Sequence, residues 1–193
     1  MQAQPGAELT LIRHAPVQGD GRVYGRRDLP ADCSNKAGFD ALRAMLSRPE
    51  RLIASPAQRC LQTSAQLWPG LTPETHADLW EQSFGAWEGL PFGDIPDIGP
   101  LSGELLAEHR PPEGESFADI CARISPILND IALRGPATIV AHAGTVRAAL
   151  ALAIGTVAPA LSFDVKPLSV TRITLLPGGQ FVIGGVNQCA TAP

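Results

Sequence analysis

Three short apolar runs along the chain have the length of buried strands. They cover residues 9–12, 51–54 and 137–141. An unbroken apolar run of this length is typical of a strand that is covered on both faces of a parallel sheet. Two further strand-like segments, 170–176 and 180–186, flank a Pro-Gly-Gly turn, and this pattern predicts an antiparallel hairpin at the end of the fold.

Apolar residues at helical spacing predict four helices between these strands. The segments are 35–47, 57–68, 116–133 and 145–154. The third opens on Ser116 with Asp119 three residues later, which resembles a capping box, and contains Pro126, which should kink it. Gly155 is placed to end the fourth. Alternation of strands and helices predicts a three-layer α/β/α sandwich with a mostly parallel central sheet.

Residues 91–112 do not fit this alternation. They contain five prolines and three glycines in 22 residues. Such a composition predicts an irregular loop or lid insertion, with at most a short helix near 101–109. Because no linker divides the chain, we expect a single domain over residues 1–193, a length that one hydrophobic core can support.

Composition narrows the class of protein. The formal net charge is −4, so binding to nucleic acid or to an anionic membrane surface is not expected. No apolar run is long enough to cross a bilayer, and the first residues lack a signal-peptide pattern. The four cysteines show no metal-ligand spacing and suggest a reducing compartment. We therefore expect a soluble, cytoplasmic protein; no feature of the sequence specifies an oligomeric state.

Arginine and histidine residues follow the predicted strands. Arg13 and His14 come after the first strand, His142 follows the third, and Arg59 lies one helical turn beyond the second. Ligands of open parallel sheets bind at the carboxyl ends of the strands, so these four side chains should converge. The sequence contains no P-loop, nucleophile elbow or HExxH motif. The imidazole and guanidinium groups that remain suit phosphoryl transfer without a metal. In this reaction a neutral imidazole attacks phosphorus, and guanidinium groups neutralise the phosphoryl oxygens.

Four sequence blocks resemble the histidine phosphatase superfamily, which includes the cofactor-dependent phosphoglycerate mutases. The blocks are Leu11-Ile12-Arg13-His14-Ala15-Pro16, residues 55–64 (SPAQRCLQTS), residues 79–89 (LWEQSFGAWEG) and residues 140–147 (VAHAGTVR), with residues 112–117 (PEGESF) similar to a further segment. They occur in the order of the family and span roughly residues 8–186. The resemblance implies the phosphoglycerate mutase-like fold and a phosphatase or mutase activity with no cofactor and no metal.

The resemblance also implies roles for individual residues. His14 would be the nucleophile, Glu81 the proton donor, and Arg13, Arg59 and His142 the phosphate pocket. Taken alone, the residues leave Glu88 as a competitor for the acid, because it lies in the same block. A non-catalytic phospho-ligand binding module is an alternative that the intact pocket disfavours, and a metal site is disfavoured because the arginines would repel the ion.

Departures from the mutase pattern favour a phosphatase that acts on a small-molecule phosphomonoester. Ala15 replaces the usual glycine, and Asp20 stands where mutases usually have asparagine, so its carboxylate should point away from the phosphate. Only 60 residues separate Glu81 from His142, which is short for a mutase that must shield its intermediate from water. A phosphoglycerate mutase-type isomerase remains the alternative.

The segment that follows the first histidine carries a finer resemblance. Residues 21–30 (GRVYGRRDLP) are similar to the corresponding segment of α-ribazole phosphatases in cobalamin synthesis. Arg22, Tyr24 and Arg26 could grip or stack on a nucleotide-like leaving group. The resemblance therefore implies α-ribazole 5′-phosphate as the first substrate to test.

Overall fold

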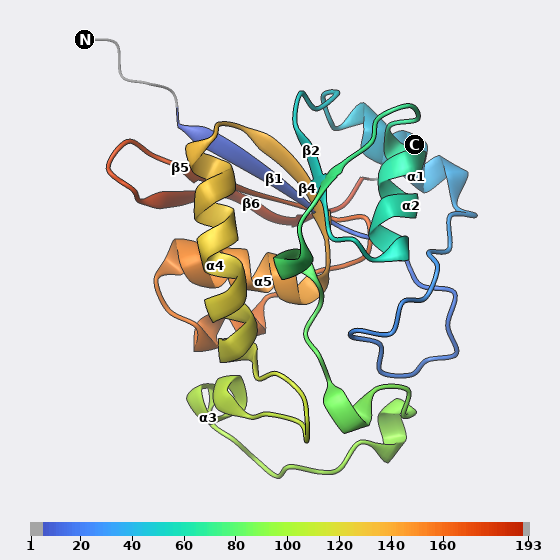
Figure 1. The fold of residues 1–193 in the computed structure, drawn as a ribbon, viewed down its shortest axis with the longest axis vertical. Helices are drawn as coiled ribbons and strands as arrows, with labels where there is room; N and C mark the ends of the chain where they lie inside the picture. The colour runs from blue at the N-terminus through green and yellow to red at the C-terminus, as the bar shows by residue number, and fades with distance from the viewer. Residues whose placement is uncertain (1–5, 191–193) are drawn as a thin grey trace.

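A single sheet organises residues 6–190, the part of the chain that the computed structural model describes (Figure 1). Its strands are β1 (Ala7–Arg13), β2 (Leu52–Ala54), β3 (Glu74–Thr75), β4 (Ala137–Ala141), β5 (Val170–Leu175) and β6 (Phe181–Gln188). Their order across the sheet is β3-β2-β4-β1-β5-β6. The strands β3, β2, β4 and β1 pair in parallel, whereas β5 pairs antiparallel with both β1 and β6. The predicted parallel strands and the final hairpin are confirmed.

Helices cover both faces of this sheet. The α-helices are α1 (Lys36–Ala44), α2 (Gln58–Leu67), α3 (Gly103–Glu108), α4 (Phe117–Leu133) and α5 (Ala143–Ile154). Short 3₁₀ helices are η1 (Ala77–Leu79), η2 (Gly85–Trp87), η3 (Phe92–Asp94) and η4 (Ala158–Ser162). In Figure 1, α1 and α2 lie on one side of the sheet, and α4 and α5 lie on the other. The predicted three-layer α/β/α architecture is therefore confirmed.

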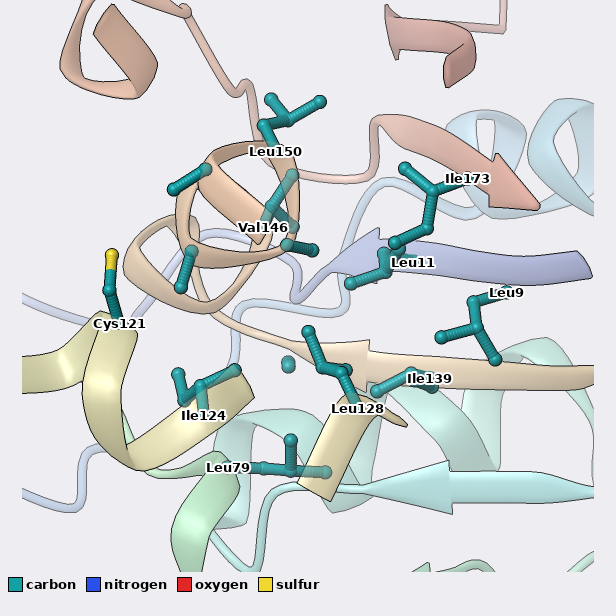
Figure 2. Packing of buried hydrophobic residues seen from close by; sticks show 14 of the residues in the cluster. Leu9, Leu11, Leu79, Cys121, Ile124, Leu128, Ile139, Val146, Leu150 and Ile173 are labelled. Atoms are coloured by element: carbon teal, nitrogen blue, oxygen red, sulfur yellow. The ribbon is translucent and has the colours of Figure 1, made fainter. Parts of the chain in front are cut away.

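The alternation of side chains along β1 explains why the sheet needs both helical layers. Leu9 and Leu11 are buried against α4 and α5, where Figure 2 shows them beside Ile139 and Leu128. Ile12 faces the other way and belongs to the cluster formed with α1 and α2. Since successive side chains of a strand point to opposite faces, an unbroken apolar run requires a cover on each face.

Local capping sets the ends of the helices that flank the site. Ser116 and Asp119 form a reciprocal capping box at the start of α4, with the Asp119 amide 3.1 Å from the Ser116 hydroxyl. The helix continues through Pro126 as one element. Gly155 ends α5 in the left-handed conformation with φ of 80°, which only glycine adopts at little cost.

The segment 91–112 is irregular, as its composition predicts, apart from η3 and α3. The sequence did not predict β3, because a strand of two exposed residues is too short to show an apolar pattern. No helix within residues 6–190 combines the length and the apolar character needed to span a membrane. The predicted domain limits of 1 and 193 lie outside the described residues.

Candidate active site

The carboxyl ends of the central strands bring the two histidines together. The backbone amide of His14, which follows β1, donates to the carbonyl of Ala141 at the end of β4, at 2.9 Å. His142 comes next in the chain, and the centroids of the two imidazole rings lie 5.2 Å apart in an edge-to-face arrangement. The convergence that the strand ends predict is present in the fold.

One hydrogen bond determines the tautomer of His14. Its Nδ1 lies 2.6 Å from the carbonyl oxygen of Ala15. A carbonyl only accepts, so Nδ1 carries the proton and Nε2 keeps its lone pair. The pKa of His14 is lowered to about 3, mainly because the ring is buried; the Ala15 contact opposes this shift, and the positive charges of Arg59 and Arg13 reinforce it. The ring is therefore neutral near pH 7 with a free nucleophilic nitrogen.

One buried and one partly buried guanidinium group flank His14. Arg59 is 1% exposed and donates to the carbonyls of Gly25 and Arg27, at 2.7 and 3.0 Å. Arg13 donates to the carbonyl of Val165 at 2.5 Å, and its Nε is buried without a hydrogen-bond partner in the described part of the chain. Burial lowers the pKa of Arg13. Each guanidinium has five N–H donors, so both retain donors for an anion beside His14.

The N-terminus of α5 positions Glu81. The carboxylate of Glu81 accepts from the backbone amide of Gly144, at 3.1 and 3.3 Å, and from its own neighbour Gln82 at 3.0 Å. Gly144 lies in the first turn of α5, where unpaired amides and the helix dipole favour a negative group. The same helix begins directly after His142 and so connects the carboxyl group to the second histidine.

Glu88 has a different environment from Glu81. Its carboxylate accepts three backbone amides, those of Arg26 at 2.7 Å, Arg27 at 2.8 Å and Phe84 at 3.1 Å. These bonds connect the segment after β1 to the segment after Glu81. A carboxylate that is fully used by backbone donors is suited to a structural role, and Glu88 is not among the residues that line the cleft.

His142 is fully buried in contact with three side chains. Its Nε2 lies 2.8 Å from the hydroxyl oxygen of Ser55 and 3.6 Å from the sulfur of Cys60. The indole of Trp80 is stacked parallel to the ring, with centroids 6.2 Å apart. Burial lowers the pKa of His142 well below its usual value, and the charges of Arg59 and Arg13 act in the same direction.

Trp80 belongs to this site but was not predicted from the sequence. Its ring stacks on His142 and lies 5.9 Å from the guanidinium carbon of Arg59, within the range of a cation–π contact. Its position directly before Glu81 was the one available signal. An aromatic residue next to an acid has many structural explanations, so this signal pointed to no function.

A cleft of about 680 Å³ opens above His14. Arg13, Arg59 and Glu81 line it, as do Arg22 and Tyr24 from the segment after β1. Among the proposed specificity residues, Arg26 does not line it. Arg26 instead pairs with Glu115 at 3.5 Å and lies over Trp80.

Asp20 lies outside the lining of the cleft. Its carboxylate pairs with the Arg22 guanidinium and accepts from the Tyr24 hydroxyl. These two contacts lower the pKa of Asp20, the tyrosine bond being the stronger cause. The carboxylate is thus paired and does not line the phosphate pocket, which agrees with the expected position of Asp20.

The donor set of the site is unsuited to a metal ion. Within residues 6–190, no three side chains of His, Cys, Asp or Glu lie close enough together to hold one. The charges of two guanidinium groups, Arg59 and Arg13, act on His14 and would repel a cation there. The same groups favour an anionic ligand.

Comparison with known proteins identifies the family. Residues 9–188 match the profile described as histidine phosphatase superfamily (branch 1). The chain therefore belongs to this superfamily, whose members are phosphatases and mutases.

Curated relatives are larger than this chain. A 6-phosphofructo-2-kinase/fructose-2,6-bisphosphatase of Caenorhabditis elegans is 30% identical over 153 residues, which cover 74% of this chain and 33% of that protein. A bifunctional protein of Mycobacterium tuberculosis is 31% identical over 129 residues, covering 60% of this chain and 35% of that protein. The chain thus spans about a third of the length of these relatives.

Solved structures share the whole fold at low sequence identity. A mycobacterial glucosyl-3-phosphoglycerate phosphatase superposes with a TM-score of 0.82 at 21% identity, covering 95% of this chain and 99% of that one. A putative α-ribazole-5′-P phosphatase of Escherichia coli gives 0.80 at 19% identity, with 97% and 98% covered. At these identities the likeness establishes the fold.

Proposed function

We propose that this chain is a metal-independent phosphomonoesterase that forms a phosphohistidine on His14. The observation that best supports this proposal is the geometry of His14. Its Nε2 lone pair is free because Nδ1 donates to the carbonyl of Ala15. The buried Arg59 and the partly buried Arg13 beside it provide the field that a phosphoryl dianion needs. Membership of the superfamily and the phosphatases among its structural neighbours support the same reaction class.

The reaction would proceed in two steps. Nε2 of His14 attacks phosphorus, an N–P bond forms, and the bond from phosphorus to the ester oxygen breaks while Glu81 gives that oxygen a proton. Water then attacks the phosphohistidine, Glu81 takes a proton from it, and the N–P bond breaks. Inorganic phosphate and neutral His14 result, and Glu81 has regained its proton.

The remaining polar groups would act on charge and orientation. Arg13 and Arg59 would neutralise the phosphoryl oxygens, on which negative charge is concentrated in the transition state. In this proposal, His142 is held by Ser55 and donates to a phosphoryl oxygen from beneath the residues that line the cleft, of which it is not one. Trp80 would keep His142 and Arg59 in place by stacking between them.

The proposed substrate is α-ribazole 5′-phosphate. The proposal rests on the resemblance of residues 21–30, and it gains support because Arg22 and Tyr24 line the cleft beside His14. A structural neighbour is described as a putative α-ribazole-5′-P phosphatase. In this proposal, Arg22 and Tyr24 contact the leaving group, and Arg26 acts through its ion pair with Glu115.

Phosphate release from a panel of phosphomonoesters, including α-ribazole 5′-phosphate, tests the proposal. We expect release in EDTA within about twofold of that without it, and a phosphoprotein on acid quenching that is labelled at His14. His14→Ala should lower turnover by at least ~10³-fold, because no other group replaces a covalent step. Near-normal activity of this variant would contradict the nucleophile. Interconversion of 2- and 3-phosphoglycerate without phosphate release would instead identify a mutase.

A further inference from the structure

The cleft above His14 concentrates the aromatic residues of the chain. The sequence contains ten Phe, Trp and Tyr residues. Half of them line this cleft, namely Tyr24, Phe84, Trp87, Phe92 and Phe117. Ile95 and Leu161 add aliphatic surface. The walls therefore offer much more apolar area than a phosphoryl group or a small polyol can use.

Two loops together form one side of the cleft, an aromatic wall made of Tyr24, Phe84, Trp87 and Phe92. The amide of Val23 donates to the carbonyl of Leu90 at 2.9 Å, and the amide of Gly89 donates to the carbonyl of Val23 at 2.8 Å. These bonds connect the segment that carries Tyr24 to the segment that carries Phe84, Trp87 and Phe92. The wall is thus a built surface that is fixed to the strand end carrying His14.

Phe92 is the most exposed part of this wall. It lies in η3 and is 65% exposed. Trp87 faces the same cleft and is stacked on His109, with ring centroids 5.5 Å apart. An exposed phenylalanine and a fixed indole in the lining of one cleft offer apolar ring surface to a flat ligand.

Each charged side chain in the cleft already has an opposite charge nearby or a role at the phosphoryl group, so none is left to bind a charged leaving group. Arg13 and Arg59 serve the phosphoryl group, and Arg22 is paired with Asp20. Glu81 serves as the acid of the reaction. The other charged side chains in the lining are Arg147 and Asp164, which have opposite signs and both lie close enough to act on the Arg13 guanidinium. The outer cleft therefore has no net charge to attract an anionic alcohol.

We propose that the cleft selects phosphomonoesters of an uncharged alcohol that bears an aromatic ring system. The ring would lie against Phe92, Trp87 and Phe84 while the phosphate occupies the arginine pocket. This inference rests on the proposed phosphatase activity and specifies its substrate class. A nucleoside-type ester with an aromatic base belongs to the class, whereas phosphoglycerate and phosphoserine do not.

Esters with matched leaving-group chemistry provide the test. Ethyl phosphate and 2-(1-naphthyl)ethyl phosphate both release a primary alkoxide, so they differ mainly in apolar surface. We expect kcat/KM to be at least ~10-fold higher for the naphthyl ester, since hydrophobic pockets discriminate on this scale for much smaller groups. The compound 3-phosphoglycerate tests an anionic leaving group and should react more slowly than the naphthyl ester.

Variants assign the preference to the wall. Phe92→Ser should reduce the ratio of the two kcat/KM values by roughly 3- to 10-fold, the value of one aromatic contact. The control is Leu133→Ser, which changes another highly exposed apolar residue at the far end of α4 and should leave the ratio unchanged.

Each outcome has a distinct meaning. Phosphate release without preference for the naphthyl ester would overturn this inference and leave the phosphatase proposal standing. Faster turnover of 3-phosphoglycerate would also overturn it and assign Arg147 to an anionic leaving group. An unchanged ratio in Phe92→Ser would remove the wall from substrate selection. No release from any ester would overturn the phosphatase proposal itself.

Discussion

Arg59 illustrates how the fold fixes a single functional side chain. Its two terminal nitrogens are bound by the carbonyls of Gly25 and Arg27, and its face lies near Trp80. Each contact restricts the orientation of the planar guanidinium before any ligand arrives. A preorganised donor of this kind stabilises a transition state without reorganising during the reaction.

Substitution of Arg59 should therefore separate charge from geometry. We expect Arg59→Ala to lower kcat/KM, because the variant loses about 3 kcal/mol of transition-state stabilisation, the scale of one lost oxyanion donor. Arg59→Lys should recover only part of this, because an ammonium group lacks the fork that both carbonyls bind. The measurement is steady-state phosphate release, and equal rates for lysine and arginine at this position would exclude it from phosphoryl binding.

Glu81 and Glu88 have contrasting environments and should respond differently to the same change. Glu81→Gln should slow alkyl esters by ~10²–10⁴-fold and p-nitrophenyl phosphate much less, because a good leaving group needs little protonation. Glu88→Gln should act mainly on stability, since it weakens acceptance of three backbone amides.

Rapid-quench kinetics on both ester types, with thermal unfolding of both variants, checks this assignment. The phosphorylation step must be read separately, because Glu81 would also activate water for the second step. A leaving-group-dependent loss in Glu88→Gln, with Glu81→Gln unaffected, would transfer the acid role to Glu88.

At the scale of elements, the start of α5 connects His142, Glu81 and the sheet. A Cβ atom on Gly144 would lie 2.2 Å from Oε1 of Glu81 and 2.9 Å from a methyl group of Ile120. The helical backbone itself tolerates alanine. The absence of a side chain at this position thus allows the carboxylate to approach the helix N-terminus.

Gly144→Ala should displace the Glu81 carboxylate while the helix remains. We expect a loss of kcat on alkyl esters that approaches the loss in Glu81→Gln, with a smaller effect on p-nitrophenyl phosphate. The control is Gly103→Ala at the start of α3, where the nearest atom to a new Cβ is 3.7 Å away. Equal activity of the two alanine variants would show that Glu81 works without its contact to Gly144.

The sequence predicted the parts of this site that depend on strand ends and on motif blocks. Arg13, His14 and His142 follow apolar runs of strand length, and Arg59 lies one helical turn beyond another, so their convergence was predicted from parallel pairing. Glu81 came from the family block. These predictions depend on periodicity and spacing, which are properties of the linear chain.

The parts that could not be predicted depend on tertiary contacts. Trp80 acquires a role only when α2 and α5 place Arg59 and His142 around its ring. Glu88 is distinguished from Glu81 by backbone amides 61 and 62 residues away in the sequence. No local pattern records which of two nearby acids will meet those donors.

At the scale of the whole molecule, the two buried histidines make the fold sensitive to acid. The fold keeps His14 neutral, with a pKa of about 3 against an ordinary value of 6.5, and burial lowers the pKa of His142 as well. Between pH 3 and pH 6.5, the two histidines bind protons in the unfolded chain but stay neutral in the folded chain. The stabilisation is therefore complete above about pH 6.5 and is lost as the pH falls toward 3.

We expect the free energy of unfolding to decrease from pH 7 to pH 5 by about 2 kcal/mol for each histidine that stays neutral in the fold. Denaturant unfolding across this range measures the decrease. His14→Asn should remove roughly half of this decrease, and His142→Asn offers a second test if the first variant folds poorly.

The pH range of this experiment stops above pH 4.5, because below it paired carboxylates such as Asp119 begin to lower the stability as well. Leu133→Ser, which alters no titrating group, provides the baseline slope. The same slope in wild type and in both histidine variants would show that these rings are protonated in the folded protein, which would also deprive His14 of its neutral nucleophile.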